Sequence, residues 1–309
     1  MPRHYHTHVG SRFFTLSHNT FQQSVTMSQS FTSTPPPVPD VIISSPAPHV
    51  LLVTINRPKQ LNALRREMHW HLDALWAWFD AEPGLRCAVL TGKGRAFCTG
   101  ADLKEWHEAN NKGPVGKETA QDIEKWTDNG FGGMSNRRGK KPIIAAVNGL
   151  CLGGGFEIAI NADMIIASDK AKFGLPEVTR GVVAIAGALP RLTRVIGRQR
   201  ATEMAILGRM YTAEDLRSWG VVNKVVQGGE DDVVHEAVKW ASEVAGNSPD
   251  AVIVTREGLL GGWDGEDPKT STGKVDRGMY RVMDGGENMK EGVLSFVERR
   301  KAVWKNSKL

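Results

Sequence analysis

The feature that most restricts the fold of this chain is a recurring order of apolar run, glycine turn and amphipathic stretch. The apolar runs at 50–55, 86–90 and 142–148 are short, as is typical of buried strands. Residues 65–81 instead repeat apolar side chains at helical spacing. Strands separated by helices favour an α/β core, although periodicity alone does not fix its topology.

The same patterns predict the remaining elements. Two further strands are expected at 164–167 and 221–226, and from residue 231 the chain is mostly helix-patterned. The helical pattern from residue 231 onward predicts a helical segment appended to the core. Residues 107–140 are polar, Gly-rich and without a period, which predicts a surface excursion or a mobile lid. The expected helices are 65–81, 156–162, 201–207, 213–219, 233–245, 249–260 and 292–303.

Two glycine loops, each leading from a strand into a helix, carry the residues best suited to chemistry. One loop starts at Gly100, and the other contains Gly153-Gly-Gly-Phe-Glu157, with Glu177 twenty residues further on. Free amides at a helix N-terminus bind anions, and two amides converging on one oxygen would form an oxyanion hole beside carboxylates that move protons. Considered alone, each loop is equally well explained as a tight turn with a carboxylate at the helix start.

Several common motifs are absent from the sequence. Gly92-Lys-Gly94 lacks the spacing of a phosphate-binding loop, and Ile158 stands where a dinucleotide fingerprint needs glycine. His107-Glu108 and His235-Glu236 lack the second histidine of a zinc protease. No Gly-x-Ser-x-Gly nucleophile turn occurs. We therefore expect neither a metal nor a nucleotide cofactor.

The three cysteines, Cys87, Cys98 and Cys151, are too few and too scattered for a disulfide framework or a zinc site. Cys87 and Cys151 lie in apolar runs and are expected in the core. Cys98 lies in a glycine-rich loop, where a catalytic thiol is conceivable, but no histidine nearby in the sequence would activate it. The cysteine usage favours a reducing compartment.

Three motifs together resemble the enoyl-CoA hydratase/isomerase (crotonase) family. They are Asn56-Arg-Pro-Lys-Gln-Leu-Asn-Ala-Leu64, Phe97-Cys-Thr-Gly-Ala-Asp-Leu-Lys-Glu105 and Leu152-Gly-Gly-Gly-Phe-Glu-Ile-Ala159. The resemblance covers roughly residues 45–306, with the motifs in the family's order. It implies a crotonase-like spiral of ββα repeats with a C-terminal helical trimerisation segment, and an assembly into a homotrimer or homohexamer. The ligand would be an acyl-CoA, with coenzyme A as part of the substrate.

The resemblance also assigns roles to particular positions. It implies that the backbone amides of Ala101 and Gly154 hold the thioester carbonyl, while Glu157 and Glu177 are the two catalytic glutamates. Glu157 would take a proton from the water that attacks C3, and Glu177 would deliver one to C2. Family members that lack one glutamate tend to catalyse isomerisation or hydrolysis, and hydratases keep both. The implied substrate- and CoA-binding positions are Lys59, Leu61, Ala101, Asp102, Leu103, Lys104, Gly153, Gly154, Ile185, Phe296 and Arg299.

The sequence departs from many hydratases just after Glu177. Where those proteins carry a glycine-rich loop, this chain reads Gly181-Val-Val-Ala-Ile-Ala-Gly-Ala-Leu-Pro190, with Ile185 and Ala188 at expected glycine positions. The acyl pocket should therefore differ in shape from that of a straight-chain enzyme. This run and the Ser-Lys-Leu ending resemble fungal peroxisomal members of the family. They imply a branched substrate such as mevalonyl-CoA in siderophore biosynthesis.

Three functions stay open on this evidence. The first is an enoyl-CoA hydratase, acting in either direction. The second is an isomerase or a thioester hydrolase on the same fold, and the third is a non-catalytic CoA- or RNA-binding protein. The net charge of +5 suits the phosphates of CoA but equally fits ordinary surface lysines and arginines. Because no basic stripe is interleaved with aromatics and no apolar run reaches membrane-spanning length, we expect neither nucleic acid nor a membrane as partner.

The two ends of the chain are expected to lie outside the fold. Residues 1–40 carry no acidic residue before Asp40 and include a proline run at 35–39, which predicts a disordered tail with some transit-peptide character or a start at Met27. Ser307-Lys308-Leu309 is the tripeptide read by the peroxisomal import receptor. The expected organisation is a tail over 1–40, a spiral core over 41–235, trimerisation helices over 236–306 and the targeting tripeptide over 307–309. The peroxisomal matrix is the predicted location, with mitochondrial and cytosolic locations as alternatives.

Overall fold

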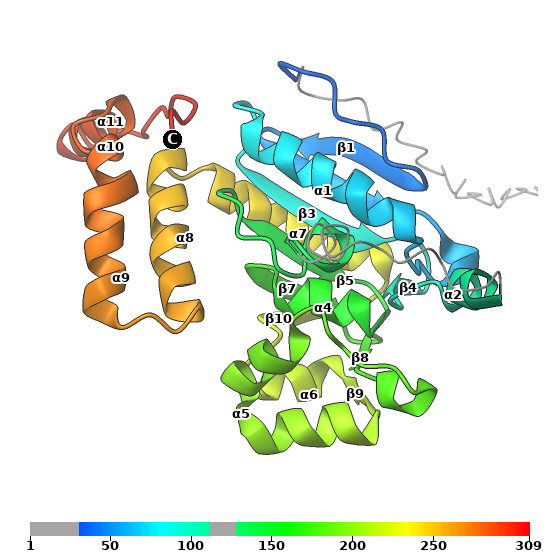
Figure 1. Cartoon of the computed structure of the whole chain (residues 1–309). Helices are drawn as coiled ribbons and strands as arrows, with labels where there is room; N and C mark the ends of the chain where they lie inside the picture. The colour runs from blue at the N-terminus through cyan, green and yellow to red at the C-terminus, as the bar shows by residue number, and fades with distance from the viewer. Residues whose placement is uncertain (1–30, 112–127) are drawn as a thin grey trace, which may run out of the picture.

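A computed structural model describes residues 31–111 and 128–309, and its core contains two β-sheets (Figure 1). The six-stranded sheet has the order β1-β2-β3-β5-β7-β10, and the four-stranded sheet has the order β4-β6-β8-β9. All neighbours are parallel except the pairs β1–β2 and β8–β9. The strands are β1 Val41–Ala47, β2 Val50–Ile55, β3 Cys87–Gly92, β4 Ala96–Cys98, β5 Ile143–Val147, β6 Leu150–Leu152, β7 Met164–Ser168, β8 Lys172–Gly174, β9 Met210–Thr212 and β10 Lys224–Val226.

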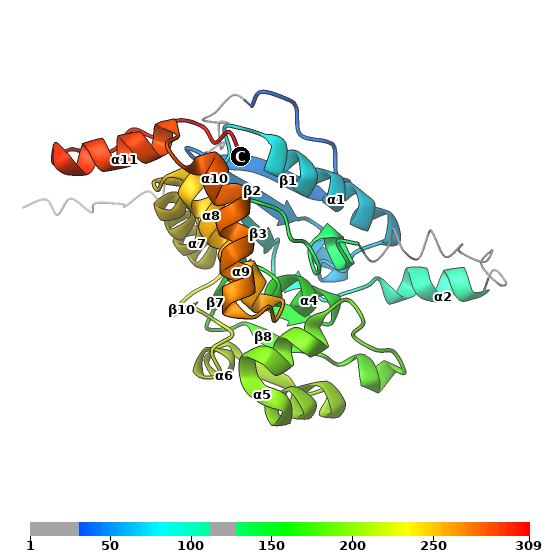
Figure 2. The ribbon, with the colours of Figure 1, turned by 60° about the vertical axis from the view of Figure 1, so that its left-hand side comes forward.

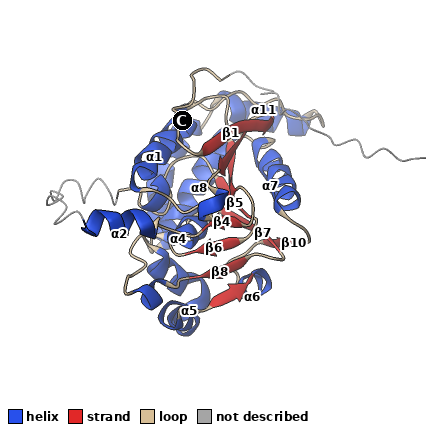
Figure 3. Ribbon diagram, turned by 90° about the vertical axis from the view of Figure 1, so that its right-hand side faces the viewer, coloured by secondary structure: helices blue, strands red, loops and turns tan. Residues whose placement is uncertain are grey.

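The chain winds as a spiral in which each turn gives one strand to each sheet. β3 is followed by β4, β5 by β6 and β7 by β8, and each pair then leads into a helical segment (Figure 3). This is the predicted crotonase-like spiral of ββα repeats. The core helices are α1 Arg66–Ala81, α2 Leu103–Asn111, α4 Gly154–Ile160, α5 Ala188–Leu207, α6 Ala213–Ser218 and α7 Glu230–Ala245, with short helices η1 Pro58–Gln60, η2 Phe131–Gly133 and η3 Glu177–Arg180.

The six-stranded sheet is buried on both faces, which explains why its strands read as continuous apolar runs rather than as alternating ones. Leu51, Val53 and Leu90 face a core shared with α1, α4 and α5. Val50 and Val89 face the other way, onto α7. The predicted boundary at residue 235 therefore needs correction, because it cuts α7, which packs on the sheet and belongs to the core.

The C-terminal helices α8 Pro249–Trp263, α9 Pro268–Val275, η4 Asp276–Tyr280, α10 Arg281–Met283 and α11 Glu287–Val297 form a separate layer beside the core. Figure 2 shows α11 and α2 at opposite sides of the molecule. The last helix was expected over 292–303 but ends at Val297. Arg299 has a left-handed φ of 52°, and its N–H bonds back to Phe296, so the chain turns out of the helix there. No helix of the described residues is long and apolar enough to cross a membrane.

Two segments expected to lie on the surface are packed. Residues 31–40, assigned to the disordered tail, lie against α1: Thr32 and Ser33 hydrogen-bond to Glu82, and Val38 is buried. Residues 1–30 lie outside the described residues. Part of the expected excursion at 107–140 is also core, because η2 packs on α1 with Gly133 and Met134 buried. The glycines of this segment suggested a surface loop, but they instead allow its backbone to lie close to α1.

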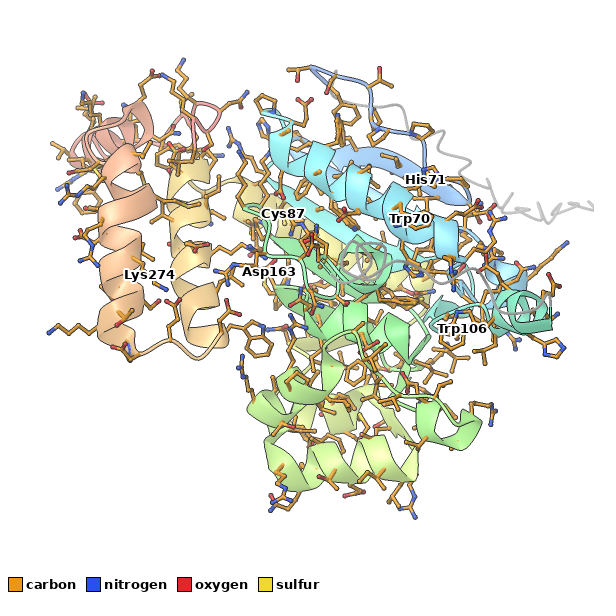
Figure 4. The ribbon with its side chains drawn as sticks, in the orientation of Figure 1. Trp70, His71, Cys87, Trp106, Asp163 and Lys274 are labelled. Carbon is orange, nitrogen blue, oxygen red and sulfur yellow. The ribbon has the colours of Figure 1, made fainter. Side chains whose placement is uncertain are left out.

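One buried ion pair fastens α8 to the core. Arg256 Nε donates to Asp163 Oδ1 at 2.7 Å, and Asp163, which Figure 4 shows on the core side facing α8, also accepts from Ile143 N–H at 2.8 Å. The Arg256 and Asp163 side chains are 6% and 19% exposed. The Arg256 guanidinium also bonds to the carbonyls of Arg138 and Gly139. Removal of the cation would leave buried acceptors without their donor.

We expect Arg256→Met to lower the free energy of unfolding by about 3 kcal/mol, because a buried carboxylate loses its partner. Arg217→Met is the matched control, since the Arg217–Glu214 pair is exposed on α6. It should cost less than about 0.5 kcal/mol. Urea denaturation followed by circular dichroism measures both. Equal effects of the two substitutions would contradict the structural role of Arg256.

Candidate active site

A cavity of about 370 Å³ lies where the glycine loops, the start of α1 and the segment after β8 meet. Its wall is formed by α1, α2, η2, α4, η3 and the loop that follows η3. Seven predicted site residues line it, namely Ala101, Leu103, Gly153, Gly154, Glu157, Glu177 and Ile185. The structure thus brings the two glycine motifs and both glutamates to one cavity.

The two glycine loops approach each other so closely that side chains are excluded. Gly100 has a φ of 93°, and a Cβ built on it would lie 3.0 Å from the backbone nitrogen of Gly154. Gly153 has a φ of 54°, and a Cβ there would lie 3.1 Å from Glu177 Oε1. Left-handed φ values are tolerated mainly by glycine. Glycine at these positions therefore brings the second loop and the second carboxylate up to the start of α4.

Ala101 and Gly154, one on each loop, are the candidate amide donors of the cavity. Gly154 is the first residue of α4, so its N–H has no acceptor inside the helix. Leu64 N–H bonds to Gly100 O, and Asp102 N–H bonds to Leu64 O, so the intervening Ala101 N–H points away from Leu64. Ala101 and Gly154 both line the cavity. Such a pair of amides can hold a carbonyl oxygen that gains negative charge.

Glu157 lies one turn into α4 and is buried, with 4% of its surface exposed. Its Oε1 accepts hydrogen bonds from Ala186 N–H at 2.8 Å and Ala188 N–H at 3.2 Å. The pKa of Glu157 is raised to about 7, mainly by burial and also by the nearby Glu177, while the amide bonds and Arg191 oppose the shift. A carboxylate with a pKa near 7 can accept and release a proton at neutral pH.

Glu177 is the first residue of η3, and its carboxyl lies next to Gly153. Its Oε2 atom is buried and has no hydrogen-bond partner among the residues the structure describes. Burial raises the pKa of this carboxyl as well. A protonated carboxyl needs an acceptor and an ionised one needs a donor, so the unpartnered oxygen marks a position for substrate or water. The cavity therefore holds two carboxyls with raised pKa values beside two amide donors.

Six predicted binding residues lie outside this cavity. Lys59 and Lys104 are exposed, and Leu61 is half-buried with a left-handed φ of 52°. Asp102 forms an ion pair with Arg57 at 3.0 Å, so its side chain serves the loop itself. Phe296, which is 85% exposed, lies in α11, and Arg299 lies just beyond its end; Figure 2 shows α11 and α2, a helix that lines the cavity, at opposite sides of the molecule. Ligand contacts for these residues stay predictions.

The cavity also contains residues that sequence reasoning missed. His69 comes from α1, and Phe131 and Asn136 come from the segment taken for a surface excursion. Val182 and Val183 lie in the run after Glu177 that predicted a pocket of different shape, but they were not named as binding residues. A histidine within the apolar face of the 65–81 helix was a detectable signal, because polar residues on a core-facing stripe are unusual. The contribution of Phe131 was not detectable, because its segment has no periodic pattern.

The described residues contain no group of three His, Cys, Asp or Glu side chains that could hold a metal ion. All three cysteines are buried. Burial raises the pKa of the Cys98 thiol to about 12, so it stays protonated and does not act as a nucleophile at neutral pH.

A spiral of ββα repeats that brings two glycine loops and two glutamates to one cavity is typical of the enoyl-CoA hydratase class of enzymes. The sequence model of the enoyl-CoA hydratase/isomerase family matches residues 47–307, and the chain belongs to this family. It is similar to mevalonyl-coenzyme A hydratase SIDH of Beauveria bassiana, with 64% identity over 279 residues that cover 90% of this chain and 99% of the relative. Mevalonyl-coenzyme A hydratase of Aspergillus fumigatus is 46% identical, with 89% and 98% covered.

Solved structures agree with this assignment. The enoyl-CoA hydratase of Mycobacterium tuberculosis superimposes with a TM-score of 0.75 at 33% identity, covering 87% of this chain and 100% of that one. The Bacillus anthracis enoyl-CoA hydratase gives a TM-score of 0.76 at 29% identity, with the same coverage. The predicted fold and family are confirmed.

The pKa values of the two glutamates predict the pH dependence of the reaction. In the roles that the family resemblance implies, hydration needs Glu157 ionised, so kcat/KM should rise with pH up to about 7, where Glu157 titrates. It should fall again when Glu177, whose pKa is also raised, loses its proton. A pH series of initial rates under kcat/KM conditions measures both limbs. A profile that stays flat between about pH 5 and 8 would show that neither carboxyl transfers a proton.

Proposed function

We propose that this protein is a hydratase of branched enoyl-CoA thioesters, and that mevalonyl-CoA is its hydrated substrate or product. The observation that carries the proposal is the meeting of the buried Glu157 and the half-buried Glu177 at one cavity, which Ala101 and Gly154 also line. The two relatives named as mevalonyl-coenzyme A hydratases support the choice of acyl group.

The mechanism follows from the positions of these groups. The amides of Ala101 and Gly154 would hold the thioester oxygen, so that electron density drawn from the C2=C3 double bond makes C3 electrophilic. Glu157 takes a proton from water as its oxygen bonds to C3, and Glu177 gives a proton to C2 of the enolate. In the reverse direction Glu177 removes the C2 proton and Glu157 protonates the departing hydroxyl. The proton count balances in both directions.

We propose that the loop after η3 forms the part of the cavity that binds the acyl chain. Val182, Val183 and Ile185 line it, and Ala186 and Ala188 supply the N–H groups that hold Glu157. A loop that carries branched side chains shapes the pocket while its backbone orients the base. We propose that this combination accepts a substrate with a substituent on C3.

Isomerisation and thioester hydrolysis are the competing reactions on this fold. The presence of two carboxyls at one cavity favours hydration, because water addition uses one base and one acid on the same face of the substrate. Mass spectrometry separates the three outcomes. Hydration adds the mass of one water and keeps CoA, isomerisation leaves the mass unchanged, and hydrolysis releases free CoA.

We also propose that the chain forms a homo-oligomer, a trimer or a hexamer. A groove of about 870 Å³ runs between α8 and the core, and exposed apolar side chains gather on the C-terminal helices, among them Leu259, Val293 and Phe296. In an oligomer, Phe296 and Arg299 would reach the CoA bound by a neighbouring copy. A peroxisomal matrix location, through Ser307-Lys308-Leu309 and the import receptor, and a role in siderophore biosynthesis are further proposals.

Glu157→Gln and Glu177→Gln should each lower kcat for hydration about 10²- to 10⁴-fold, because each removes one proton-transfer group. Glu214→Gln is the control, since Glu214 is exposed on α6. Enoyl-CoA absorbance and product mass, measured on the full chain, report the rates. Near-normal turnover in either active-site variant would contradict the proposed reaction. Binding of acyl-CoA without turnover by the wild type would favour a non-catalytic role.

A further inference from the structure

Arg191 is a partly buried cation beside the loop that holds Glu157. It lies near the start of α5 and does not line the cavity, so it is not placed to touch a substrate bound there. A positive charge is unfavourable near a helix N-terminus, because the helix dipole already makes that end positive. The position of Arg191 therefore needs a reason other than the stability of α5.

The guanidinium of Arg191 fills the space beside Gly187. Gly187 has a φ of 112°, and a Cβ built on it would lie 2.1 Å from Arg191 Nη1 and 2.6 Å from Asn136 Oδ1. Arg191 Nη1 donates to that asparagine oxygen at 3.0 Å. Asn136 follows η2 and lines the cavity, so Arg191 links the loop at Gly187 to the segment after η2.

The residues on either side of Gly187 hold the proposed base. Ala186 N–H and Ala188 N–H both donate to Glu157 Oε1, at 2.8 Å and 3.2 Å. Because both donors are backbone groups, the two bonds depend on the conformation of the loop rather than on its side chains. A side chain that fixes Gly187 thus fixes both donors of Glu157.

The charge of Arg191 also acts on Glu157. Arg191 Nε is buried and has no hydrogen-bond partner among the residues that the structure describes. Burial and Arg194 lower the pKa of Arg191, and Glu157 opposes them. In turn, the pKa of Glu157 is raised mainly by burial, and Arg191 opposes that shift. Because a guanidinium stays charged at neutral pH, Arg191 favours the ionised form of the base.

Other titratable groups surround Glu157. The carboxylate of Glu177, on η3, raises its pKa. The ring of His69 is neutral at neutral pH, because its pKa is lowered to about 4, mainly by burial. Glu177 and Arg191 are the charged groups that shift the pKa of Glu157 most. The remaining titratable side chains on the elements around it are Arg66, Glu105, Arg180, Arg194 and the buried thiols of Cys98 and Cys151.

We propose that Arg191 is a positioning residue for the reaction: it fixes the loop at Gly187 and keeps the Glu157 carboxylate ionised. The inference rests on the proposed hydratase function, in which Glu157 accepts a proton from water. Arg191 acts through the loop and through its charge, without touching the substrate. Its loss should therefore change the pH at which the enzyme becomes active more than the rate once Glu157 is ionised.

Substitutions at Arg191 separate the effect of its charge from that of its size. Arg191→Gln removes the positive charge and keeps an amide donor for Asn136 Oδ1, whereas Arg191→Lys keeps the charge. Arg191→Met is a second neutral variant, so a folding defect in one of them leaves the test intact. Arg198→Gln is the matched control, because Arg198 is exposed on the same helix. The probe is 5-hydroxy-3-methylpent-2-enoyl-CoA, the dehydrated form of mevalonyl-CoA, and circular dichroism checks that each variant is folded.

We expect Arg191→Gln and Arg191→Met to move the acidic limb of the kcat/KM profile upward by about 0.5 to 1 pH unit, because the carboxylate loses a nearby opposite charge. Near pH 6 this lowers kcat/KM about three- to tenfold, and the effect shrinks as pH rises through the limb. Arg191→Lys should keep the limb within about 0.3 pH units of that of the wild type. Arg198→Gln should leave the limb unchanged.

The inference is overturned if neither neutral variant moves the limb, or if Arg191→Lys moves it as far as they do. A uniform loss of kcat/KM at every pH, with the limb in place, would assign Arg191 to the support of the fold alone. Failure of the hydratase function looks different, because the wild-type protein would then not hydrate the probe at any pH.

Discussion

The close approach of two backbone segments at the start of α4 is the constraint on which the rest of the structure depends. A Cβ at Gly155 would lie 2.1 Å from Cys98 O, and one at Gly100 would lie 3.0 Å from Gly154 N. Only residues without side chains allow α4 to start against β4 and the loop that follows it. That contact sets the distance between successive turns of the spiral, and it leaves the first amide of α4 facing the cavity. Fold and site thus share one packing requirement.

The packing at the start of α4 also removes carboxyl oxygens of Glu157 and Glu177 from water, and this lowers the stability of the protein near neutral pH. The pKa of Glu157 is raised in the folded state, so the native state binds its proton more tightly than the unfolded chain does. The stability this provides is complete below the ordinary pKa of a glutamate and is lost as pH rises through about 7. The amides of Ala186 and Ala188 limit that loss by bonding to Oε1. Near neutral pH the protein therefore keeps its base partly ionised at some expense of stability.

The sequence was sufficient to predict the turn that carries the proposed catalytic groups, but not the wall of the cavity. Glu157, Glu177, Ala101 and Gly154 belong to short motifs in which residue type and position are tied to one backbone geometry, so they were predictable and meet at the cavity as expected. The segment containing Phe131 has no such pattern, and its packing on α1 depends on contacts distant in sequence. The end of the last helix, near Arg299, was also predicted wrongly, because the chain leaves this helix through a left-handed residue. A left-handed residue other than glycine leaves no compositional signal.

The side chains around the proposed acyl pocket and the turn at the start of α4 come from different parts of the chain. This separation has a consequence for substrate specificity. The amides and carboxyls are held by backbone contacts around α4, in which side-chain volume is excluded. His69, Phe131 and Val183 line the cavity from α1, η2 and the loop after η3. Exchanging these side chains alters the shape and polarity of the acyl pocket while the backbone at α4 is undisturbed. A family that keeps one thioester-activating turn can thus change its acyl group by substitutions on surrounding elements.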